Sequence, residues 1–393
     1  MTLHDRQGQR FLPYGANYLD WQDMPELREV IEHQVLFRYQ TEQESMASRL
    51  ERLVSARLGV ARTLAVHNAT EALRLALIST RPSVGDLVHI PAVTFVAVAG
   101  AVLSCGLIPV LVDADESLSL DPTLLPADAE RVIVAHMEGS VAALPQGVPY
   151  VIEDCAQTLG GRFPDGREVG TAGYAGVYSF HHNKVLTSGE GGLVVSDDEQ
   201  AWARMRCYHD HGSARVPGRY PTWDQDAHYG ENFVTSEEVA AIQCQQFRHL
   251  DEVLAGLERM YGLALEALPN RTDLQALPRT RGDVKVSLRF RCESRELRDA
   301  AVAALTAEGI ANWTLGKYLL PEHPVLTGRR SLYADGFPWS LAPEGQALAL
   351  SRDGFARTRD LLERTLCIPL SPELPQEQQA VAVKAIRRVL EAV

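Results

Sequence analysis

Short runs rich in β-branched residues alternate with helical segments through the first two thirds of this 393-residue chain. The alternation is typical of an α/β fold with a mainly parallel sheet and helices on both faces. The predicted strands are 63–66, 87–90, 108–112, 131–135, 150–152, 176–180 and 192–196, and the predicted helices include 46–58, 69–79, 97–105 and 199–209. In such sheets ligands bind beyond the carboxyl ends of the strands, so functional side chains are expected there.

The last third of the chain has a different pattern. Apolar periodicity predicts a long helix from Ser236 to about Leu265, followed by a smaller α+β region. That region is predicted to contain strands at 285–292 and 366–369 and helices at 297–308 and 376–392. Because a chain of this length exceeds what one core usually covers, we expect a large domain at 1–250 and a small C-terminal domain at 251–393.

Charge and composition exclude several classes of partner. The net charge of −13 and the pI near 5.4 argue against nucleic-acid and anionic-membrane partners, which call for a basic face. Residues 90–112 carry no charge, but two prolines and two glycines divide them, so a buried helix and strand are predicted instead of a membrane span. Residues 204–233 lack periodicity and are predicted to form a long functional loop.

The chain is expected to be cytoplasmic. Residues 1–7 lack the apolar core of a signal peptide. The six cysteines are scattered without a Cys-x-x-Cys pair, which is typical of buried free thiols in a reducing compartment.

Lys184 is one of only four lysines, against 34 arginines, and lies in the run Ser179-Phe-His-His-Asn-Lys-Val-Leu-Thr-Ser-Gly-Glu-Gly-Gly192. A lysine amine condenses with an aldehyde, and a loop of Ser, Thr and Gly supplies the small residues and amides that hold a phosphate. The combination indicates a seat for pyridoxal 5'-phosphate (PLP). The alternative is a surface lysine in a Gly-rich turn.

Asp154 ends the apolar run Tyr150-Val-Ile-Glu-Asp. An acid at the carboxyl end of a strand faces the ligand crevice, where a carboxylate keeps a pyridinium nitrogen protonated and makes the ring an electron sink. One more predicted strand separates Asp154 from Lys184, so both are expected to reach one cofactor. The alternative role of Asp154 is a helix cap.

The run His67-Asn-Ala-Thr-Glu-Ala-Leu opens a helix directly after a strand. This places the amides of Ala69 and Thr70 at a helix N-terminus, which binds phosphate, although an ordinary Asn or Thr cap would have the same sequence. Phe95 follows another strand and is a candidate to lie flat on an aromatic ring, whereas most such phenylalanines belong to the core.

Other chemistries lack their residues. His181-His182 and His209-Asp-His211 are poorly placed for chelation, and no Cys or acid cluster completes a ligand set, so no metal is expected. The chain has no Gly-x-Ser-x-Gly elbow of a serine hydrolase. The glycines after the lysine do not open a helix, which argues against a dinucleotide fingerprint.

Five motifs follow one another in a specific order: Asn68-Ala-Thr-Glu-Ala-Leu, Pro91-Ala-Val-Thr-Phe, Ile152-Glu-Asp-Cys-Ala-Gln, Ser179-Phe-x-x-x-Lys and Gly189-Glu-Gly-Gly. Together they resemble the DegT/DnrJ/EryC1/StrS family of PLP-dependent sugar aminotransferases. The later runs Gly230-Glu-Asn-Phe, Ser236-Glu and Cys367-Ile-Pro-Leu-Ser-Pro extend the resemblance to nearly the whole chain. The lysine and aspartate motifs are the specific ones, and the others are supportive.

The resemblance implies a fold type I, aspartate-aminotransferase-like subunit that works as a homodimer with shared active sites. It implies that Lys184 forms a Schiff base with the cofactor and that Asp154 pairs with the pyridinium nitrogen. Gln157 would lie near the ring substituents, and Phe95 would stack on the ring. Some members of the family carry histidine in place of the lysine and are dehydratases, which Lys184 argues against here.

The resemblance also assigns the cofactor phosphate to Ala69, Thr70 and Ser179, together with Asn232 of the partner subunit. Two departures affect this assignment. Members commonly have Arg two residues after that Asn, where this chain has Val234, so a ligand contact of that arginine is absent or relocated. The usual Ser-Gly-Thr reads Asn68-Ala69-Thr70, which keeps the threonine and leaves backbone amides for the phosphate.

The function predicted from these residues is transfer of an amino group from an amino acid, expected to be L-glutamate, to a keto-sugar that is nucleotide-linked or an 8-keto-octulosonate. The octulosonate rests on a resemblance of three runs to the subgroup that aminates it: Phe37-Arg-Tyr39, His136-Met-Glu-Gly-Ser and Asp210-His-Gly. Two alternatives stay open. One is a PLP-dependent dehydratase or eliminase, and the other is a PLP-binding regulator without turnover, which Val234 motivates.

Overall fold

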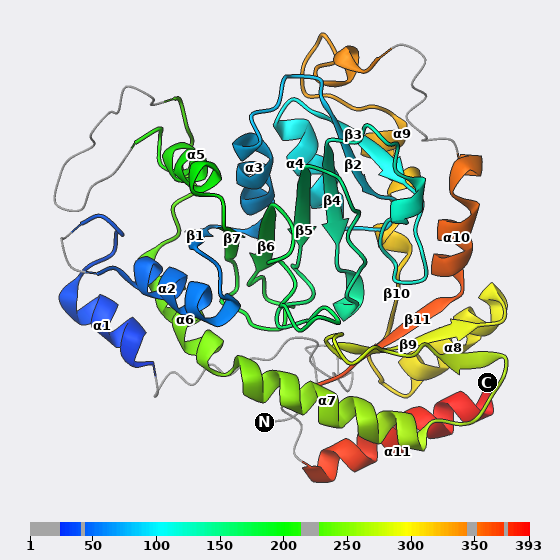
Figure 1. Ribbon diagram of the computed structural model, residues 1–393. Coiled ribbons are helices and arrows are strands. Elements are labelled where there is room, and N and C mark those ends of the chain that lie inside the picture. The colour runs from blue at the N-terminus through cyan, green and yellow to red at the C-terminus, as the bar shows by residue number, and fades with distance from the viewer. Residues whose placement is uncertain (1–23, 41–43, 214–227, 344–351, 373–375) are drawn as a thin grey trace.

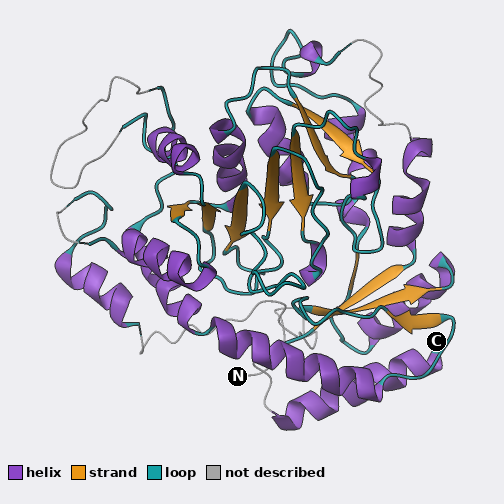
Figure 2. Cartoon of the chain, viewed as in Figure 1, coloured by secondary structure: helices purple, strands orange, loops and turns teal. Residues whose placement is uncertain are grey.

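Two β-sheets organise the computed structural model, which describes residues 24–40, 44–213, 228–343, 352–372 and 376–393 (Figure 1). Seven strands form the larger sheet and four form the smaller one. Helices flank the larger sheet, and the smaller sheet lies beside it with its own helices (Figure 2).

The larger sheet has the strand order β1-β7-β6-β5-β4-β2-β3. Its strands are β1 (Arg62–Val66), β2 (Leu87–Pro91), β3 (Ile108–Val112), β4 (Arg131–Ala135), β5 (Tyr150–Asp154), β6 (Ala175–Ser179) and β7 (Gly192–Ser196). The predicted mainly parallel sheet is confirmed, with β7 antiparallel to both of its neighbours. The register pairs Asp154 with Ala135 and with Val177, so the carboxyl ends of β4, β5 and β6 lie side by side.

Helices cover both faces of this sheet, because its strands carry apolar side chains toward each face. On one face α3 (Ala69–Ser79), α4 (Val96–Ser104) and α5 (Glu199–His209) share a core with the strands. On the other face α2 (Met46–Leu58) and α6 (Glu237–Arg248) pack, with α1 (Pro25–His33) against α6. The predicted bounds of α2, α3 and α5 are confirmed.

The smaller sheet is antiparallel and has the order β10-β11-β9-β8. Its strands are β8 (Leu274–Ala276), β9 (Ser287–Cys292), β10 (Trp313–Thr314) and β11 (Thr365–Pro369). One face packs on α7 (Leu250–Ala267), α8 (Arg295–Ala307) and α11 (Gln376–Ala392). On the other face Cys367 packs with Ala135 and Met137, which brings this sheet to the carboxyl edge of the larger one.

The helix predicted from Ser236 to Leu265 is wrong as a single element. The structure divides it into α6 and α7 at His249, whose φ of −91° and ψ of 1° are not helical. One apolar core contains residues of α2, α7 and α11, so the division at residue 250 stays a prediction.

Residues 204–233 are not wholly a loop, because α5 continues to His209. Residues 214–227 of this segment, like residues 1–7 at the start of the chain, lie outside the described part. Five short elements escaped prediction: α1, β8, β10, α9 (Pro324–Thr327) and α10 (Ala356–Glu363).

The uncharged stretch 90–112 forms the end of β2, α4 and β3, as the helix-and-strand prediction requires. Throughout the described ranges, none of the helices has both the length and the apolar character needed to cross a membrane. The six cysteines are all free of disulfides, and four of them are buried while Cys105 and Cys207 are half-buried.

Candidate active site

A cavity of about 230 Å³ lies beyond the carboxyl ends of β4, β5 and β6. Its wall also includes the first turn of α3, the start of α4 and the short turn Gly316–Tyr318 from the C-terminal part of the chain. The structure brings seven of the eight predicted site residues to this wall: Ala69, Thr70, Phe95, Asp154, Gln157, Ser179 and Lys184. The strand ends therefore gather the predicted chemistry in one place.

Lys184 lies in the connection between β6 and β7, whose facing ends pair at Ser179 and Gly192. Its backbone N–H donates to the carbonyl of His181 at 3.0 Å, which turns the chain so that the lysine lines the cavity. Burial lowers the pKa of Lys184, an effect that the carboxylates of Asp154 and Glu138 oppose. The alternative of a surface lysine is wrong, because this amine belongs to a cavity wall and loses its proton more readily than a solvated lysine.

Asp154 is the last residue of β5 and is 9% exposed. One carboxylate oxygen accepts a hydrogen bond from the backbone N–H of Ala156 at 3.0 Å. No helix begins there, since β6 is the next element, so the helix-cap alternative is wrong. Burial raises the pKa of Asp154, while the Ala156 amide and then Lys184 oppose that rise. A cationic partner would favour the ionised form of this carboxylate.

The first turn of α3 is shaped to hold an anion. Asn68 caps the helix, and its side chain accepts from the backbone N–H of Glu71 at 3.0 Å. The amides of Ala69 and Thr70 precede it at the N-terminus, where the helix dipole favours negative charge. A Cβ on Gly192 would lie 2.7 Å from the backbone N of Ala69, so β7 approaches this turn closely only because residue 192 is glycine.

Three further predicted residues, Phe95, Gln157 and Ser179, line the same cavity as Lys184 and the first turn of α3. Phe95 precedes α4 and keeps 54% of its surface exposed, so a ring here is available to a ligand. Gln157 accepts from the backbone N–H of Glu138 at 2.9 Å, which fixes its side chain. Ser179, at the end of β6, accepts from the backbone N–H of His181 at 3.3 Å.

Asn232 does not line the cavity. It lines a neighbouring hollow of about 490 Å³ together with Leu36, Phe37 and Val234, and the two spaces share Asn68 and Glu190. Its side-chain oxygen accepts from the backbone N–H of Val234 at 3.2 Å. Within one chain, therefore, Asn232 is separate from the other seven predicted residues.

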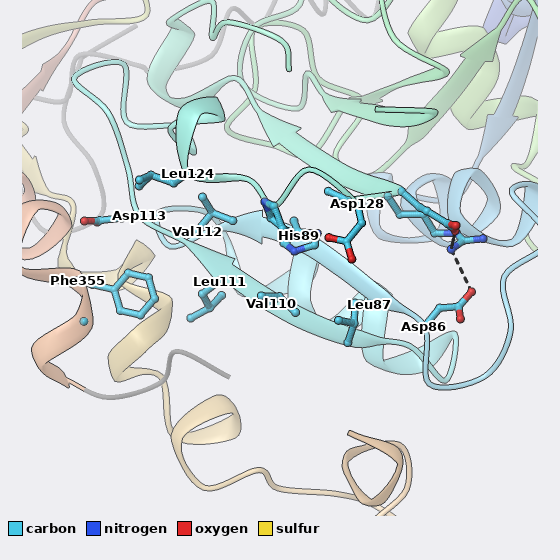
Figure 3. A pocket seen from close by; sticks show the side chains of 15 residues that line it. Asp86, Leu87, His89, Val110, Leu111, Val112, Asp113, Leu124, Asp128 and Phe355 are labelled. Atoms are coloured by element: carbon cyan, nitrogen blue, oxygen red, sulfur yellow. Dashed lines mark hydrogen bonds and ion pairs between the residues drawn. The ribbon is translucent and has the colours of Figure 1, made fainter. Parts of the chain in front are cut away.

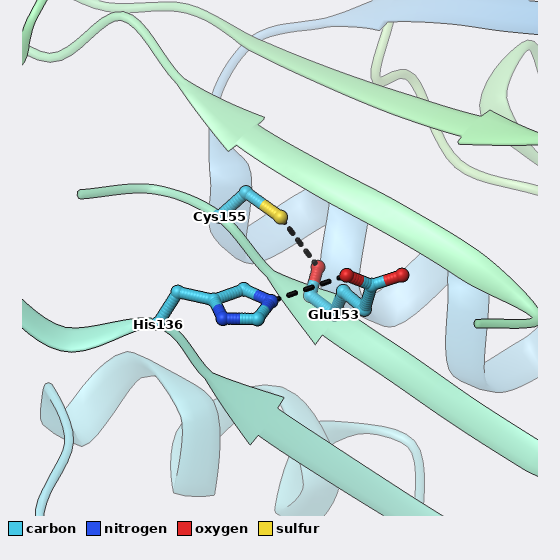
Figure 4. A group of neighbouring side chains, drawn as sticks. All are labelled: His136, Glu153 and Cys155. Carbon is cyan, nitrogen blue, oxygen red and sulfur yellow. Dashed lines mark hydrogen bonds and ion pairs between the residues drawn. The ribbon is translucent and has the colours of Figure 1, made fainter. Parts of the chain in front are cut away.

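His136, Glu153 and Cys155 form a buried cluster at the ends of β4 and β5, with one ligand-type atom from each within 4.8 Å of the others (Figure 4). The backbone N–H of Ala142 donates to Nδ1 of His136 at 3.0 Å, so Nε2 carries the proton and donates to Glu153 at 3.1 Å. Cys155 donates its thiol to the Glu153 carbonyl at 3.7 Å. Both imidazole nitrogens are therefore already occupied, and the cluster is a hydrogen-bond network, not a vacant ligand set.

Glu153 is the anchor of this network. Its two carboxylate oxygens also accept backbone N–H groups, from Gly170 at 2.7 Å and from Ala172 and Gly173 at 2.8 and 2.7 Å. Burial would raise the pKa of Glu153, but the hydrogen bond from His136 and those from the amides outweigh it and lower the pKa. The strand that ends in Asp154 is held in place by an ionised neighbour.

Two histidine pairs considered from sequence also have other partners. Nδ1 of His181 lies 2.8 Å from Oδ1 of Asn183, and its Nε2 lies 3.1 Å from Nδ1 of His182. Burial lowers the pKa of His209 to about 4, so this imidazole is neutral at pH 7, and its Nδ1 bonds the Arg206 carbonyl at 2.9 Å.

Sequence reasoning missed three residues around the cavity. Lys317 and Tyr318 line it from the C-terminal part of the chain, and buried Glu138 lies in the loop after β4 with φ of 52°. No motif links them to the lysine loop, although Glu138 belongs to the run His136-Met-Glu-Gly-Ser.

A larger hollow of about 730 Å³ lies at the opposite side of the sheet, over the edge formed by β2 and β3 (Figure 3). Its walls carry the acids Asp86, Asp113 and Asp128 beside His89. None of the eight predicted site residues lines this larger hollow, so the smaller cavity remains the candidate active site.

Known proteins share both the sequence pattern and the architecture. The profile of the DegT/DnrJ/EryC1/StrS aminotransferase family matches residues 18–387. The UDP-N-acetyl-3-dehydro-alpha-D-glucosamine 3-aminotransferase of Acidithiobacillus ferrooxidans is 32% identical over 355 residues, covering 87% of this chain and 88% of that protein. The L-glutamine:2-deoxy-scyllo-inosose aminotransferase of Streptoalloteichus tenebrarius is 38% identical over 229 residues, 53% of each chain. The matched part thus spans about half the length of this second relative.

A solved structure shows the same fold. The E. coli GDP-4-keto-6-deoxy-D-mannose-3-dehydratase with bound hydrated PLP has a TM-score of 0.78 over 97% of this chain and 99% of that one. The identity is 16%, so this likeness concerns the fold alone. The predicted fold type I architecture is confirmed.

Proposed function

The chain belongs to the DegT/DnrJ/EryC1/StrS aminotransferase family, and from this premise we propose that it is a PLP-dependent enzyme that transfers an amino group from an amino acid to the ketone of a sugar. The observation that carries the proposal is the meeting of Lys184 and Asp154 on the wall of one cavity. An amine with a lowered pKa and a buried carboxylate are the two side chains that this chemistry requires.

Bound PLP supplies a ring that accepts electrons from a substrate carbon. In our proposal Lys184 holds the cofactor covalently and afterwards, as a free amine, moves a proton to and from that carbon. Asp154 accepts a hydrogen bond from the ring nitrogen and keeps it protonated. Gln157 is placed by its bond to the Glu138 amide to touch the ring substituents, and Phe95 covers the ring.

The phosphate belongs, in this proposal, to the first turn of α3 and to the end of β6. Ala69, Thr70 and Ser179 all line the cavity, and the amides at the start of α3 favour negative charge. The proposal adds Asn232 of the partner subunit, because this residue lies outside the cavity of its own chain. A homodimer with shared sites follows from that assignment.

Transamination is favoured over the two alternatives. A dehydratase of this fold is known, but Lys184 occupies the place of the histidine that the family's dehydratases carry. A regulator without turnover has no need of a lysine with a lowered pKa facing a buried acid. Amino-group transfer therefore accounts for more of the residues that line the cavity than either alternative does.

The proposed substrates are an amino-acid donor, L-glutamate, and a keto-sugar that is nucleotide-linked or an 8-keto-octulosonate. The two relatives carry names with a nucleotide-linked sugar and with a cyclitol, and the second names L-glutamine as donor. We place the enzyme in the cytoplasm, with a cofactor-binding domain at 1–250 and a small domain at 251–393.

The test of this function uses Lys184→Ala. Borohydride should fix PLP to Lys184 of the natural chain, and L-glutamate or L-glutamine should convert its absorbance to that of the amine form. The alanine variant should do neither, while Lys384→Ala, on the exposed face of α11, should do both. Full activity without Lys184, or a PLP-loaded natural chain that responds to no amino acid, would refute transamination.

A further inference from the structure

Two of the four lysines of the chain line the same cavity, Lys184 and Lys317. The other two have different surroundings. Lys285 is buried, donates to backbone carbonyls and forms an ion pair of 3.0 Å with Glu258, whereas Lys384 is exposed on α11. Lys317 is itself exposed but lines the cavity, and the proposed function has no use for it.

Lys317 is held at the cavity by its own backbone. The turn that carries it is tied to the wall because the Thr94 N–H donates to the Tyr318 carbonyl at 3.1 Å and because Val93 and Leu319 form a β-bridge. Its ammonium lies 4.9 Å from the centre of the Tyr318 ring. Among the ion pairs of the described residues Lys317 takes part in none, so its charge is available to a ligand.

The acid in electrostatic contact with Lys317 is buried Glu138. One of its carboxylate oxygens, Oε2, is buried without a hydrogen-bond partner. The same carboxylate interacts with Arg279 and Arg289 of the C-terminal part and with Lys184. Arg289 is 4% exposed, its Nε and Nη1 are likewise without partners, and Asp283 is a second acid that interacts with it.

The next step rests on the proposed function. There Lys184 and Asp154 are both engaged with the cofactor, while Glu190 lines both this cavity and the neighbouring hollow and lies 3.8 Å from His181. Besides Lys184, Lys317 is the lysine or arginine that the described cavity wall offers to a ligand, with Glu138, Arg279 and Arg289 interacting nearby. In a partly dry cavity a cation without an ion pair favours an anionic ligand.

The anion must fit beside Lys184. In an amino donor the carbon that bears the amine also bears a carboxylate, so this group has to enter the cavity of about 230 Å³ with the reacting atoms. An acceptor that is a sugar acid brings a carboxylate as well. We propose that Lys317 binds the carboxylate of a substrate in this cavity, and that buried Glu138 weakens this binding.

The experiment measures ligand affinity by calorimetry on PLP-loaded chains in the Lys184→Ala background, where turnover does not interfere. L-Glutamate is compared with L-isoglutamine, which lacks the α-carboxylate, and with L-glutamine, which lacks the side-chain carboxylate. Lys317→Gln should weaken binding of the ligand that carries the bound carboxylate by roughly tenfold to a hundredfold, the range for a charge-assisted hydrogen bond. It should leave the ligand without that carboxylate unchanged.

Glu138→Gln should act in the opposite direction and tighten the same ligand, while Lys317→Arg should restore most of the affinity. Lys384→Gln is the matched control for a lost lysine charge on the surface. A second arm repeats the titration on chains holding the amine form of the cofactor, with a keto-octulosonate against the uncharged scyllo-inosose. A loss of affinity that occurs only in this second arm assigns Lys317 to the acceptor. A loss of affinity that occurs only in the first arm assigns it to the donor.

The proposal would be overturned if the natural chain and Lys317→Gln bound every ligand with equal affinity. It would also be overturned if ligands bound tightly whether or not they carried either carboxylate. Such a result leaves the absorbance test of transamination in the natural chain untouched. Conversely, carboxylate-dependent binding in a protein that never converts PLP to the amine form would refute the proposed function and leave the role of Lys317 standing.

Discussion

At the scale of single residues, substitution of Asp154 tests the proposed cofactor chemistry directly. Asp154→Asn keeps the size of the side chain and the acceptor for the Ala156 amide, but a neutral amide does not hold the ring nitrogen in its protonated form. A charge-assisted hydrogen bond is worth roughly 1.5–3 kcal/mol, so we expect kcat to fall at least about tenfold.

Schiff-base formation at Lys184 should survive this change, and absorbance of the PLP-loaded variant measures it. Asp165→Asn, an exposed acid paired with Arg167, is the matched control and should keep the natural rate. A rate close to that of the natural chain in Asp154→Asn would show that another group partners the ring.

Lys184 and Asp154, which the structure brings to one cavity wall, both had a local signal in the sequence. Lys184 stands out by rarity and by its loop, and Asp154 by ending an apolar strand, so both depended on neighbours within a few positions. Glu138 and Lys317 had no such signal. Their meeting depends on the smaller sheet packing at the carboxyl edge of the larger one, which local pattern does not encode.

At the scale of elements, the contact between β7 and the start of α3 makes a prediction. A methyl group on residue 192 would strike the backbone of Asn68 and Ala69, so Gly192→Ala should displace the first turn of the helix. We expect weaker PLP binding, measured by equilibrium dialysis, and a loss of roughly 1–3 kcal/mol in the free energy of unfolding from overpacking.

Gly100→Ala is the control for this change, because the added methyl group in α4 meets nothing within 4 Å. It should leave PLP affinity as it is and raise stability slightly, since alanine favours a helix. If Gly192→Ala binds PLP like the natural chain, the close approach of β7 does not shape the phosphate site.

Element prediction succeeded where burial imposed a strong pattern and failed where it did not. The strands of the larger sheet are short apolar runs, and β3, β4 and β7 have the predicted bounds. The break at His249 went unseen because α6 and α7 share one apolar face, so periodicity continued through it. Strands β8 and β10 span three and two residues, too few for any period to register.

At the scale of the whole molecule, the separation of Asn232 from the cavity predicts that two chains build each site. Asn232→Asp should place a negative charge against the cofactor phosphate and weaken PLP binding while the fold persists, because repulsion in a partly dry site is several times stronger than in water. Each of Asn232→Asp and Lys184→Ala should be nearly inactive alone.

Mixed and reassociated, the two variants should regain activity, because one site of each heterodimer then receives both natural residues. Sedimentation confirms the mixing, and the recovered rate is measured as transamination. Heterodimers without recovery, or a fully active monomer, would contradict a shared site.

The order of the cavity residues along the chain has a consequence for synthesis. The seven predicted site residues on the cavity wall all lie between positions 69 and 184, whereas Lys317 and Tyr318 follow more than a hundred residues later. A ribosome therefore delivers Lys184 and Asp154 well before it delivers the turn that completes the wall. An unfinished polypeptide has these two side chains but lacks the part of the wall that Lys317 and Tyr318 provide, so the cavity is completed only late in translation.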